Sequence, residues 1–326
     1  MVTAVTVLRA QVEKPTEVAK TPQTEKPRAT PASENGAVVR TAMRNVDYHL
    51  TDHIIVHIGE LSGKLLTKSG EIPVFDDKNS FGIEIDSATI RIGMTSLTND
   101  LNEFVFAKLD SPVKKLTASV KHDKNGNQLV IKGSLTSKGG MSFESAGTLS
   151  VTPEGWIRVT TLSVKAMRMQ VHGLMDLFGL DTANLVNTDK QQGVRIDKND
   201  LLLDPEKILP PPAFKGKLTS IKIDDGEIAL TFGGKKDMEK PLASGCGGKN
   251  YILFQGGTVK FGKLTMTNSM LELVDADPQD PYDFALEHYA QQLVAGYSKS
   301  TRAGGLCVHT PDLNKIKTIA KSGETK

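Results

Sequence analysis

The sequence predicts an α+β protein in which a long, curved antiparallel sheet, half-pipe or barrel-like in form, is covered by a few amphipathic helices. Three observations support this prediction. Apolar and polar residues alternate with a period of two over most of the chain from Val46 onward. Three turn motifs each give a hairpin register that places the apolar residues on one face. Only three segments show helical spacing of their apolar residues.

The composition of the 326-residue chain excludes several classes of protein. Its 40 basic and 38 acidic residues leave a formal charge of +2, whereas a nucleic-acid-binding domain usually carries a basic stripe. We therefore expect no nucleic-acid partner. No run of about 18 apolar residues is present, so the sequence predicts no membrane-spanning helix.

Residues 1–38 are expected to form a disordered tether. The stretch VEKPTEVAKTPQTEKPRATPASENG holds prolines among Thr, Lys and Glu, and too few large apolar side chains to offset the entropy of ordering. The preceding VTAVTVL is apolar but shorter than the hydrophobic region of a signal peptide. Because such a tether commonly separates a folded module from an envelope anchor, we expect an exported protein of the periplasm or cell envelope.

The segment DYHLTDHIIVHIG, which begins at Asp47, is predicted to be a strand. His49, His53 and His57 recur every four residues, which on a helix would group three imidazoles for a metal ion. On a strand, residues four apart lie roughly 13 Å apart, too far to share one. We therefore expect histidines on the solvent face and no metal site. The predicted core residues of the segment are Tyr48, Leu50, Ile54, Val56 and Ile58.

The first predicted hairpin, LTASVKHDKNGNQLVIKGSL, turns at Asn125-Gly126. A two-residue turn at this dipeptide places every apolar residue of the hairpin on one face. The expected pairs are Val120 with Ile131, Ala118 with Gly133, and Leu116 with Leu135.

Two further hairpins are predicted from their turns. Pro153-Glu154-Gly155 suits a three-residue bulged loop, and Asp225-Gly226 suits a two-residue turn. In both, the apolar residues again fall on one face. The expected pairs are Val151 with Ile157 and Leu149 with Val159 in the first, and Ile223 with Ile228 and Ile221 with Leu230 in the second.

Three amphipathic helices are expected. The first covers LTNDLNEFVFAKL, residues 97–109, with Ser96 as N-cap. The second covers VHGLMDLFGL, residues 171–180. The third covers residues 280–296, where Asp280 is the expected N-cap and Gly296 the expected end. Its expected apolar stripe is Tyr282, Leu286, Tyr289 and Leu293.

Four aspartates around the start of the third helix could supply oxygen ligands to calcium. The glycine and final glutamate of a standard calcium loop are missing, however. We expect Asp280 and Asp283 to stabilise the helix N-terminus instead, with a calcium site as the alternative. The four residues are Asp275, Asp277, Asp280 and Asp283.

Two breakpoints divide the chain after the tether. The three prolines at 210–212 require an extended connector, since neither a helix nor a central strand admits them. The polar, glycine-rich stretch at 233–250 is the predicted domain boundary. It separates a β-rich domain, residues 39–233, from a C-terminal strand-helix subdomain, residues 234–326, whose role the sequence leaves open.

No catalytic constellation is evident. Cys307 and His309 would share a face of one strand, but no orienting group or oxyanion hole accompanies them. No nucleophile elbow and no phosphate-binding loop are present. Cys246 and Cys307 have no zinc-like spacing, and either a disulfide or two independent thiols is compatible with the sequence. We expect neither an enzyme nor a cofactor.

The order of elements from Ala88 to Gly233 resembles the LmeA-like family of bacterial envelope lipid-binding proteins. It runs from the helix LTNDLNEFVFAKL through VKKLTASVKHDKNGNQLVIKGSLTSKGGMSFESAGTLSVTPEGWIRVTTLSVKA to the helix VHGLMDLFGL and the closing LTSIKIDDGEIALTFGG. The resemblance implies a tubular lipid-binding, half-pipe sheet and a lipid ligand. It covers under half of the chain and offers nothing for residues 250–326.

The predicted function is non-enzymatic binding or transfer of a lipid or other hydrophobic small molecule, with a membrane surface or another envelope protein as a further partner. A curved sheet with an aliphatic inner face encloses a trough that suits an acyl chain. The small residues Ala118, Gly133 and Gly147 are expected to leave volume there. The alternative is an exported structural or interaction module whose sheet core is solid. The residues expected to line the trough are Leu116, Val120, Ile131, Leu135, Leu149, Val151, Ile157 and Val159 from the sheet, and Leu101, Val105, Leu174 and Phe178 from the helices.

Overall fold

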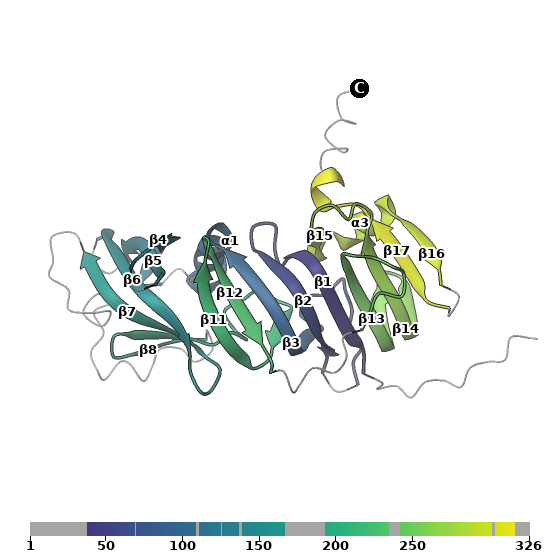
Figure 1. Cartoon of the computed structure of the whole chain (residues 1–326), viewed down its shortest axis with the longest axis horizontal. Helices are drawn as coiled ribbons and strands as arrows, with labels where there is room; N and C mark the ends of the chain where they lie inside the picture. Colours follow the sequence, from purple (N-terminus) through teal and green to yellow (C-terminus); the bar gives the residue numbers. More distant parts are fainter. Residues whose placement is uncertain are drawn as a thin grey trace, which may run out of the picture. The chain divides into compact units, whose positions relative to one another are not determined.

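The computed structural model describes residues 38–68, 70–108, 111–124, 126–136, 139–166, 193–234, 242–301 and 304–316. The predicted tether, apart from Val38, lies outside these residues. The helix expected at 171–180 also lies outside them, and with it Leu174 and Phe178. The described residues form two sheets, which we call sheet A and sheet B, and a few helices (Figure 1).

Sheet A has eleven strands, most of them antiparallel to their neighbours. Nine follow the order β11-β12-β3-β2-β1-β13-β14-β17-β16, while β10 and β15 pair in parallel with β3 and β1. The strands are β1 (Arg40–His49), β2 (Ile55–Leu66), β3 (Gly82–Gly93), β10 (Ala213–Lys215), β11 (Leu218–Asp224), β12 (Glu227–Phe232), β13 (Tyr251–Phe261), β14 (Leu264–Asp275), β15 (Tyr282–Ala285), β16 (Tyr297–Ser300) and β17 (Leu306–Thr310).

Sheet B has six strands, all antiparallel, in the order β4-β5-β6-β7-β9-β8. In sequence it is an insertion, because the chain leaves sheet A after β3 and returns to it with β10. The strands are β4 (Val113–Lys121), β5 (Gln128–Leu135), β6 (Met141–Val151), β7 (Ile157–Ala166), β8 (Val194–Asp197) and β9 (Asp200–Leu203).

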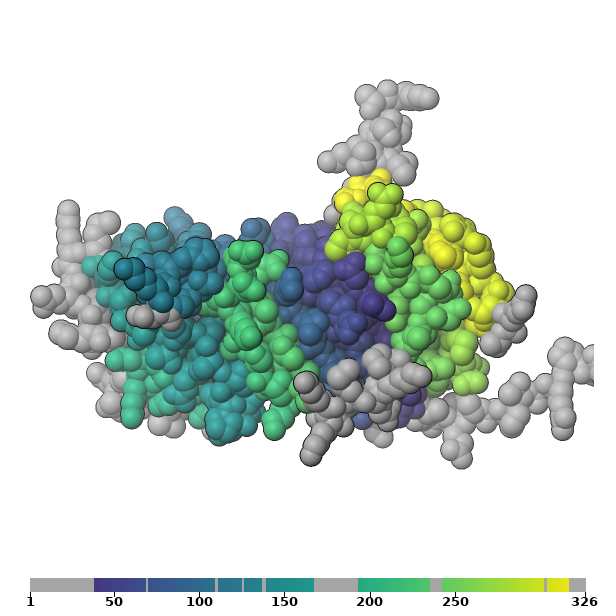
Figure 2. All heavy atoms as spheres, in the orientation of Figure 1, coloured from purple at the N-terminus to yellow at the C-terminus, as the bar shows by residue number. Residues whose placement is uncertain are grey.

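The predicted α+β class, rich in antiparallel sheet with few helices, is confirmed. The barrel-like form is not found, because the strand order of each sheet has two ends. Segments on both sides of the predicted 233–250 boundary contribute to sheet A, since β13 pairs directly with β1. In Figure 2 the N-terminal strands, in purple, accordingly lie between β11 and β12, in green, and the strands that follow the predicted boundary, in yellow-green.

Two of the three predicted hairpin registers are confirmed. Val151 pairs with Ile157 across the β6–β7 turn, and Ile223 pairs with Ile228 across the β11–β12 turn. Gly155 has φ of 87°, and Asp225 and Gly226 have φ of 45° and 83°. These left-handed conformations are the ones that short hairpin turns require, which explains why the turn sequences predicted the registers.

The register predicted from Asn125-Gly126 is wrong by two residues. Ala118 pairs with Ile131 and Val120 with Leu129, so the connection between β4 and β5 is longer than a two-residue turn. The amide of Gly126 donates to the carbonyl of Asp123, which places the tight turn earlier in the chain. Because the shift is an even number of residues, the same side chains still share one face.

The histidine-rich segment is two strands rather than one. β1 ends at His49 and β2 begins at Ile55, and the amide of Leu50 donates to the carbonyl of Ile54 in the turn between them. The two strands pair, which brings Asp47 opposite His57. The core residues predicted from this segment are nevertheless all buried: Tyr48, Leu50, Ile54, Val56 and Ile58.

The first expected helix is present as α1 (Met94–Asp100), which continues into a π-helical turn, η1 (Leu101–Val105). Ser96 is not its N-cap, because the helix begins at Met94 and no side chain caps it. The Ser96 hydroxyl instead accepts a hydrogen bond from the amide of Ile55, 3.2 Å away.

The helix expected over residues 280–296 is wrong in its first half. Residues Tyr282–Ala285 form β15, followed by a 3-10 turn (Leu286–His288) and α3 (Tyr289–Ala295). Pairing with β1 decides the outcome, because β15 completes an edge of β1 that β13 leaves after Arg44. Asp280 is therefore not a helix cap, whereas the predicted end at Gly296 is correct.

Helix α1 connects the two sheets by hydrogen bonds from different sides of its surface. Thr98 Oγ1 accepts from the amide of Ala118, and Asn102 of the adjoining η1 accepts from the amide of Leu116 in β4 and donates to its carbonyl. On the other side, Asn99 donates to the carbonyl of His53 in the β1–β2 turn. The helix therefore completes the edge of sheet B while it is held against sheet A.

Candidate functional site

The apolar face of sheet B is the candidate site. Cross-strand pairing places Ala118 beside Ile131, Leu149 beside Val159, and Val159 beside Leu201. Because side chains alternate between the two sides of a strand, these registers define one mainly apolar face across all six strands, with Ser145 and Thr161 as polar members. Its aliphatic and aromatic members are Leu116, Ala118, Val120, Leu129, Ile131, Leu135, Met141, Phe143, Leu149, Val151, Ile157, Val159, Val164, Ala166, Val194, Ile196, Leu201 and Leu203.

The apolar face is fully buried at one end and half-buried over much of its remaining area. Near β4 and β5, Leu116 and Leu135 are buried in a cluster that also holds Phe143. Leu129 and Ile157 belong to the large core cluster that extends into sheet A. Most other members are half-buried, and Val120 and Val159 belong to neither cluster.

All eight sheet residues expected to line a trough lie on this face, but they divide by burial. Leu116, Leu135 and Ile157 are buried in the core clusters, as are Leu101 and Val105 of η1. The half-buried members of the prediction are Val120, Ile131, Leu149, Val151 and Val159.

The sequence did not identify several members of the face, including Phe143, Val164 and Leu201. Val164 follows a β-bulge, where the register between β6 and β7 shifts after Ala146 and simple alternation fails. Leu201 lies in the run Leu201–Leu203, which has no alternation to follow. Pairing of β9 with β7 would have been the signal, and it is visible only in the fold.

The expectation that Gly133 and Gly147 leave free volume is wrong. A Cβ at Gly133 would lie 2.5 Å from Leu116 Cδ2 and 3.0 Å from Phe143 Cε1, so neighbouring side chains already fill that place. A Cβ at Gly147 would lie 2.6 Å from the carbonyl oxygen of Thr160. Both glycines allow close packing instead of forming a cavity.

The histidines lie within hydrogen-bonding distance of carboxylates from separate elements. His57 Nδ1 lies 2.7 Å from Asp47 Oδ1, His53 Nδ1 lies 3.1 Å from Glu103 Oε1, and His49 pairs with Asp283. Asp277 pairs with Lys315, and Asp275 accepts from Asn250. Within the described parts of the chain, no group of three or more His, Cys, Asp or Glu side chains could hold a metal ion.

Asp100 is a buried carboxyl beside the candidate site. It closes α1 directly before Leu101, and its Oδ1 has no hydrogen-bond partner among the described residues. Burial raises the pKa of Asp100 to about 8, so the carboxyl is protonated at neutral pH.

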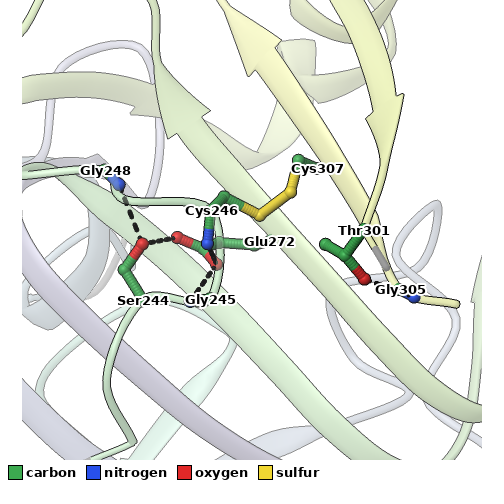
Figure 3. The surroundings of a disulfide bond; sticks show 8 residues. All are labelled: Ser244, Gly245, Cys246, Gly248, Glu272, Thr301, Gly305 and Cys307. Atoms are coloured by element: carbon green, nitrogen blue, oxygen red, sulfur yellow. Dashed lines mark hydrogen bonds between the residues drawn. A yellow bond between two sulfur atoms is a disulfide. The ribbon is translucent and has the colours of Figure 1, made fainter. Parts of the chain in front are cut away.

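Cys246 and Cys307 form a disulfide with Cα atoms 6.0 Å apart (Figure 3). The adjoining loop wraps around Glu272, whose carboxylate accepts from the Ser244 hydroxyl and from the amides of Gly245 and Cys246. Glu272 and Cys307 are register neighbours on β14 and β17. The disulfide and the buried carboxylate together hold this loop against sheet A.

Cys307 and His309 do share a face of β17, as the sequence predicted, and both line a hollow of about 500 Å³ with Lys299. The sulfur of Cys307 is bonded to Cys246, so it is no nucleophile in this state. Burial, and secondarily Lys299, lowers the pKa of His309. His309 stacks on Tyr297, with ring centroids 4.7 Å apart.

Comparison of the chain with protein-family models, with curated proteins and with solved structures found no match. Among the described residues, no helix has the length and hydrophobicity needed to cross a bilayer. The candidate site is therefore defined by its own geometry, as an aliphatic, half-buried sheet face with one buried carboxyl nearby.

Proposed function

We propose that the protein binds a lipid or another hydrophobic ligand on the apolar face of sheet B, without catalysing a reaction. One observation carries the proposal. The face extends over six strands, yet several of its side chains, including Val120 on the edge strand β4 and Val159 on β7, are only half-buried. Covering aliphatic surface of this kind with a ligand is favourable, by about 0.8 kcal/mol for each CH₂ of the ligand that is buried.

The chemistry of the face favours an acyl chain over a polar metabolite. Its aliphatic side chains present few hydrogen-bonding groups to orient a polar ligand, and α1 and η1 pack Leu97, Leu101 and Val105 against its β4 end. The half-pipe curvature implied by the LmeA-like resemblance is part of this proposal. It would bring the two ends of the face around the chain of a lipid.

The disulfide supports export to the periplasm or cell envelope. Disulfides form and persist in oxidising compartments and are rare in the cytosol, where thiols are kept reduced. Cys246 and Cys307 are the two cysteines of the chain, and they are bonded to each other. A lipid-binding protein of the bacterial envelope would meet both its ligand and an oxidising environment there.

A specific observation also favours the alternative, an exported interaction module with a solid core. Leu116 and Phe143 occupy the place that a cavity at Gly133 would need. Leu135 is fully buried in the same cluster. In that case the half-buried side chains of sheet B would contact another envelope protein instead of a small ligand.

Titration with dansyl-labelled undecanoic acid distinguishes the two. Trp156 is the single tryptophan of the chain and adjoins Ile157 of the apolar face, so energy transfer from Trp156 to the dansyl group reports binding at this face. Val159→Asn should weaken binding about tenfold or more, because it places an amide against the acyl chain. Ser163→Asn, at an exposed position of the same strand that pairs with Ala146 on the opposite side of the sheet, is the control and should bind like the parent.

A second variant, Val120→Asn on β4, guards against misfolding of the first, and thermal melts check both. Lipid extracted from protein purified from a bacterial periplasm and identified by mass spectrometry gives an independent measurement. Parent protein that carries no lipid and takes up no labelled fatty acid would exclude ligand binding and leave the interaction module.

A further inference from the structure

The side of sheet B opposite its apolar face carries a row of charged residues. Lys132 of β5 lies opposite Glu144 of β6, and Glu144 lies opposite Lys165 of β7. Side-chain alternation places all three on the side that faces away from Ile131 and Val164. A hollow of about 540 Å³ opens at this row, lined by these residues together with Lys115, Ser134 and Ser142, and also by Gly133, Phe143 and Ala166.

Lys115 joins the row through an irregularity of its strand. The register between β4 and β5 shifts between Lys114 and Thr117, and Lys115 has a left-handed backbone with φ of 54°. A bulge of this kind redirects a side chain, and a left-handed lysine costs free energy that the surrounding structure must supply. Lys115 thereby lines the hollow with Lys132 and Lys165.

The cations of this hollow exceed its anions. Three lysines and one glutamate line it, and Lys132 Nζ lies 3.3 Å from Glu144 Oε2. Lys115 and Lys165 are exposed, and no carboxylate of the described residues pairs with either. On sheet A, Lys64 pairs with Glu84 and Arg91 with Glu227, so these two cations are each matched by one anion.

We propose that this lysine hollow is the surface with which the protein docks on an anionic membrane. The inference rests on the proposed function, because a lipid-binding protein must meet the membrane that supplies or receives its ligand. Exposed lysines that line one hollow can approach lipid phosphates together, and their charge attracts an anionic surface whether or not a ligand is bound. Charge complementarity therefore assigns the lysine row of sheet B to the bilayer, while the apolar face remains the proposed ligand site.

Vesicle co-sedimentation tests the proposal. Vesicles of phosphatidylcholine alone are compared with vesicles containing one third phosphatidylglycerol. The full chain should bind only the anionic vesicles, and less strongly in 0.5 M salt, because salt screens exposed charges. Lys115→Gln with Lys165→Gln should weaken binding about 25-fold, since each lysine near an anionic surface contributes a factor of about five. Lys249→Gln with Lys263→Gln, two exposed lysines in the loops that flank β13, is the matched control.

The docking inference fails if the parent ignores anionic vesicles, or if the Lys115 and Lys165 double variant binds them like the parent. Uptake of dansyl-undecanoic acid, measured on the same samples without vesicles, separates this failure from that of the proposed function. If uptake is retained but docking does not depend on the lysines, only the membrane-docking inference is refuted. If docking depends on the lysines but no fatty acid is taken up, the membrane-docking inference is supported and only the proposed ligand binding is refuted.

Discussion

Sheets A and B share one sequence pattern but differ in how completely they bury it. In sheet A, Ile58, Ile252 and Leu273 are fully buried in a core that also contains Tyr48 and Phe254. In sheet B, Leu135 reaches the same burial, while Ile131, Leu149 and Val159 remain half-buried. Period-two alternation therefore identifies the apolar face of a strand without deciding whether that face becomes a closed core or an accessible surface.

The aromatic residues allow the two sheets to be observed separately. Trp156 lies at the β6–β7 turn of sheet B, where Arg195 lies 5.3 Å from its ring centroid. All five tyrosines belong to sheet A or to α3, which packs on it. Tryptophan fluorescence therefore reports on sheet B and tyrosine signals report on sheet A, and the following predictions use this difference.

The largest expected effect comes from Asp100, on the helix bonded to both sheets. An exposed aspartate in the unfolded chain has a pKa of about 3.9, whereas burial raises the pKa of Asp100 to about 8 in the folded protein. Between these values the folded protein keeps a proton that the unfolded chain has released. The free energy of unfolding should therefore fall as the pH rises from about 4 to about 8, by up to about 5 kcal/mol.

Asp100→Asn cannot ionise, so this part of the pH dependence should disappear and the variant should be more stable than the parent at pH 8. Urea unfolding at pH 5, 6, 7 and 8 measures it. A fall reported by both tryptophan and tyrosine signals would show that α1 couples the two sheets. Parent and variant curves with the same slope against pH would contradict the burial of this carboxyl.

A matched pair of isoleucines tests the difference in packing directly. Ile58 of sheet A is 0 % exposed and Ile131 of sheet B is half-buried. Ile58→Ala should lower the free energy of unfolding by about 4 kcal/mol, because it leaves a cavity in a closed core. Ile131→Ala should cost about 1–2 kcal/mol, because less of its surface is removed from water in the folded state. Equal losses in urea melts would mean that sheet B is packed as tightly as sheet A.

The sequence predicted local features well where short turns determine them. Gly155 and Asp225-Gly226 require left-handed conformations, and both hairpin registers followed from them. The register predicted for the β4–β5 connection was wrong because the geometry of this connection depends on side chains and on a distant strand. Asn127 bonds His122 within the loop and donates to the carbonyl of Ile223 in β11, a contact that no local pattern contains.

Long-range pairing also explains the error at residues 282–285. Tyr282 and Phe284 fit a strand, while Tyr282, Leu286 and Tyr289 fit a helix, so both patterns coexist in one segment. The open edge of β1 decides between them. For the candidate site, the sequence placed eight sheet residues on one face, but the burial that separates Leu116 from Val120 depends on the packing of α1 and Phe143. Such packing is a property of the assembled sheet.

Gly133→Ala gives the smallest expected effect, and its sign discriminates between a packed and an open face at this point. The new Cβ would lie 2.5 Å from Leu116 Cδ2 and 3.2 Å from the carbonyl oxygen of Lys114, so Leu116 must move. Overpacking of this kind costs about 1–3 kcal/mol, and the lower entropy of alanine in the unfolded chain returns about 0.4–1 kcal/mol of it. A net loss of about 1 kcal/mol is expected in urea melts followed by Trp156. An open face would instead give a gain in stability, because the methyl group would meet no neighbour.

Adding Leu116→Val to Gly133→Ala makes room for the methyl group. The double variant should therefore lose less stability than the two single losses added together, a coupling expected only for residues in contact. Strict additivity would mean that Leu116 does not fill the space at Gly133, and that this end of sheet B is as accessible as its centre.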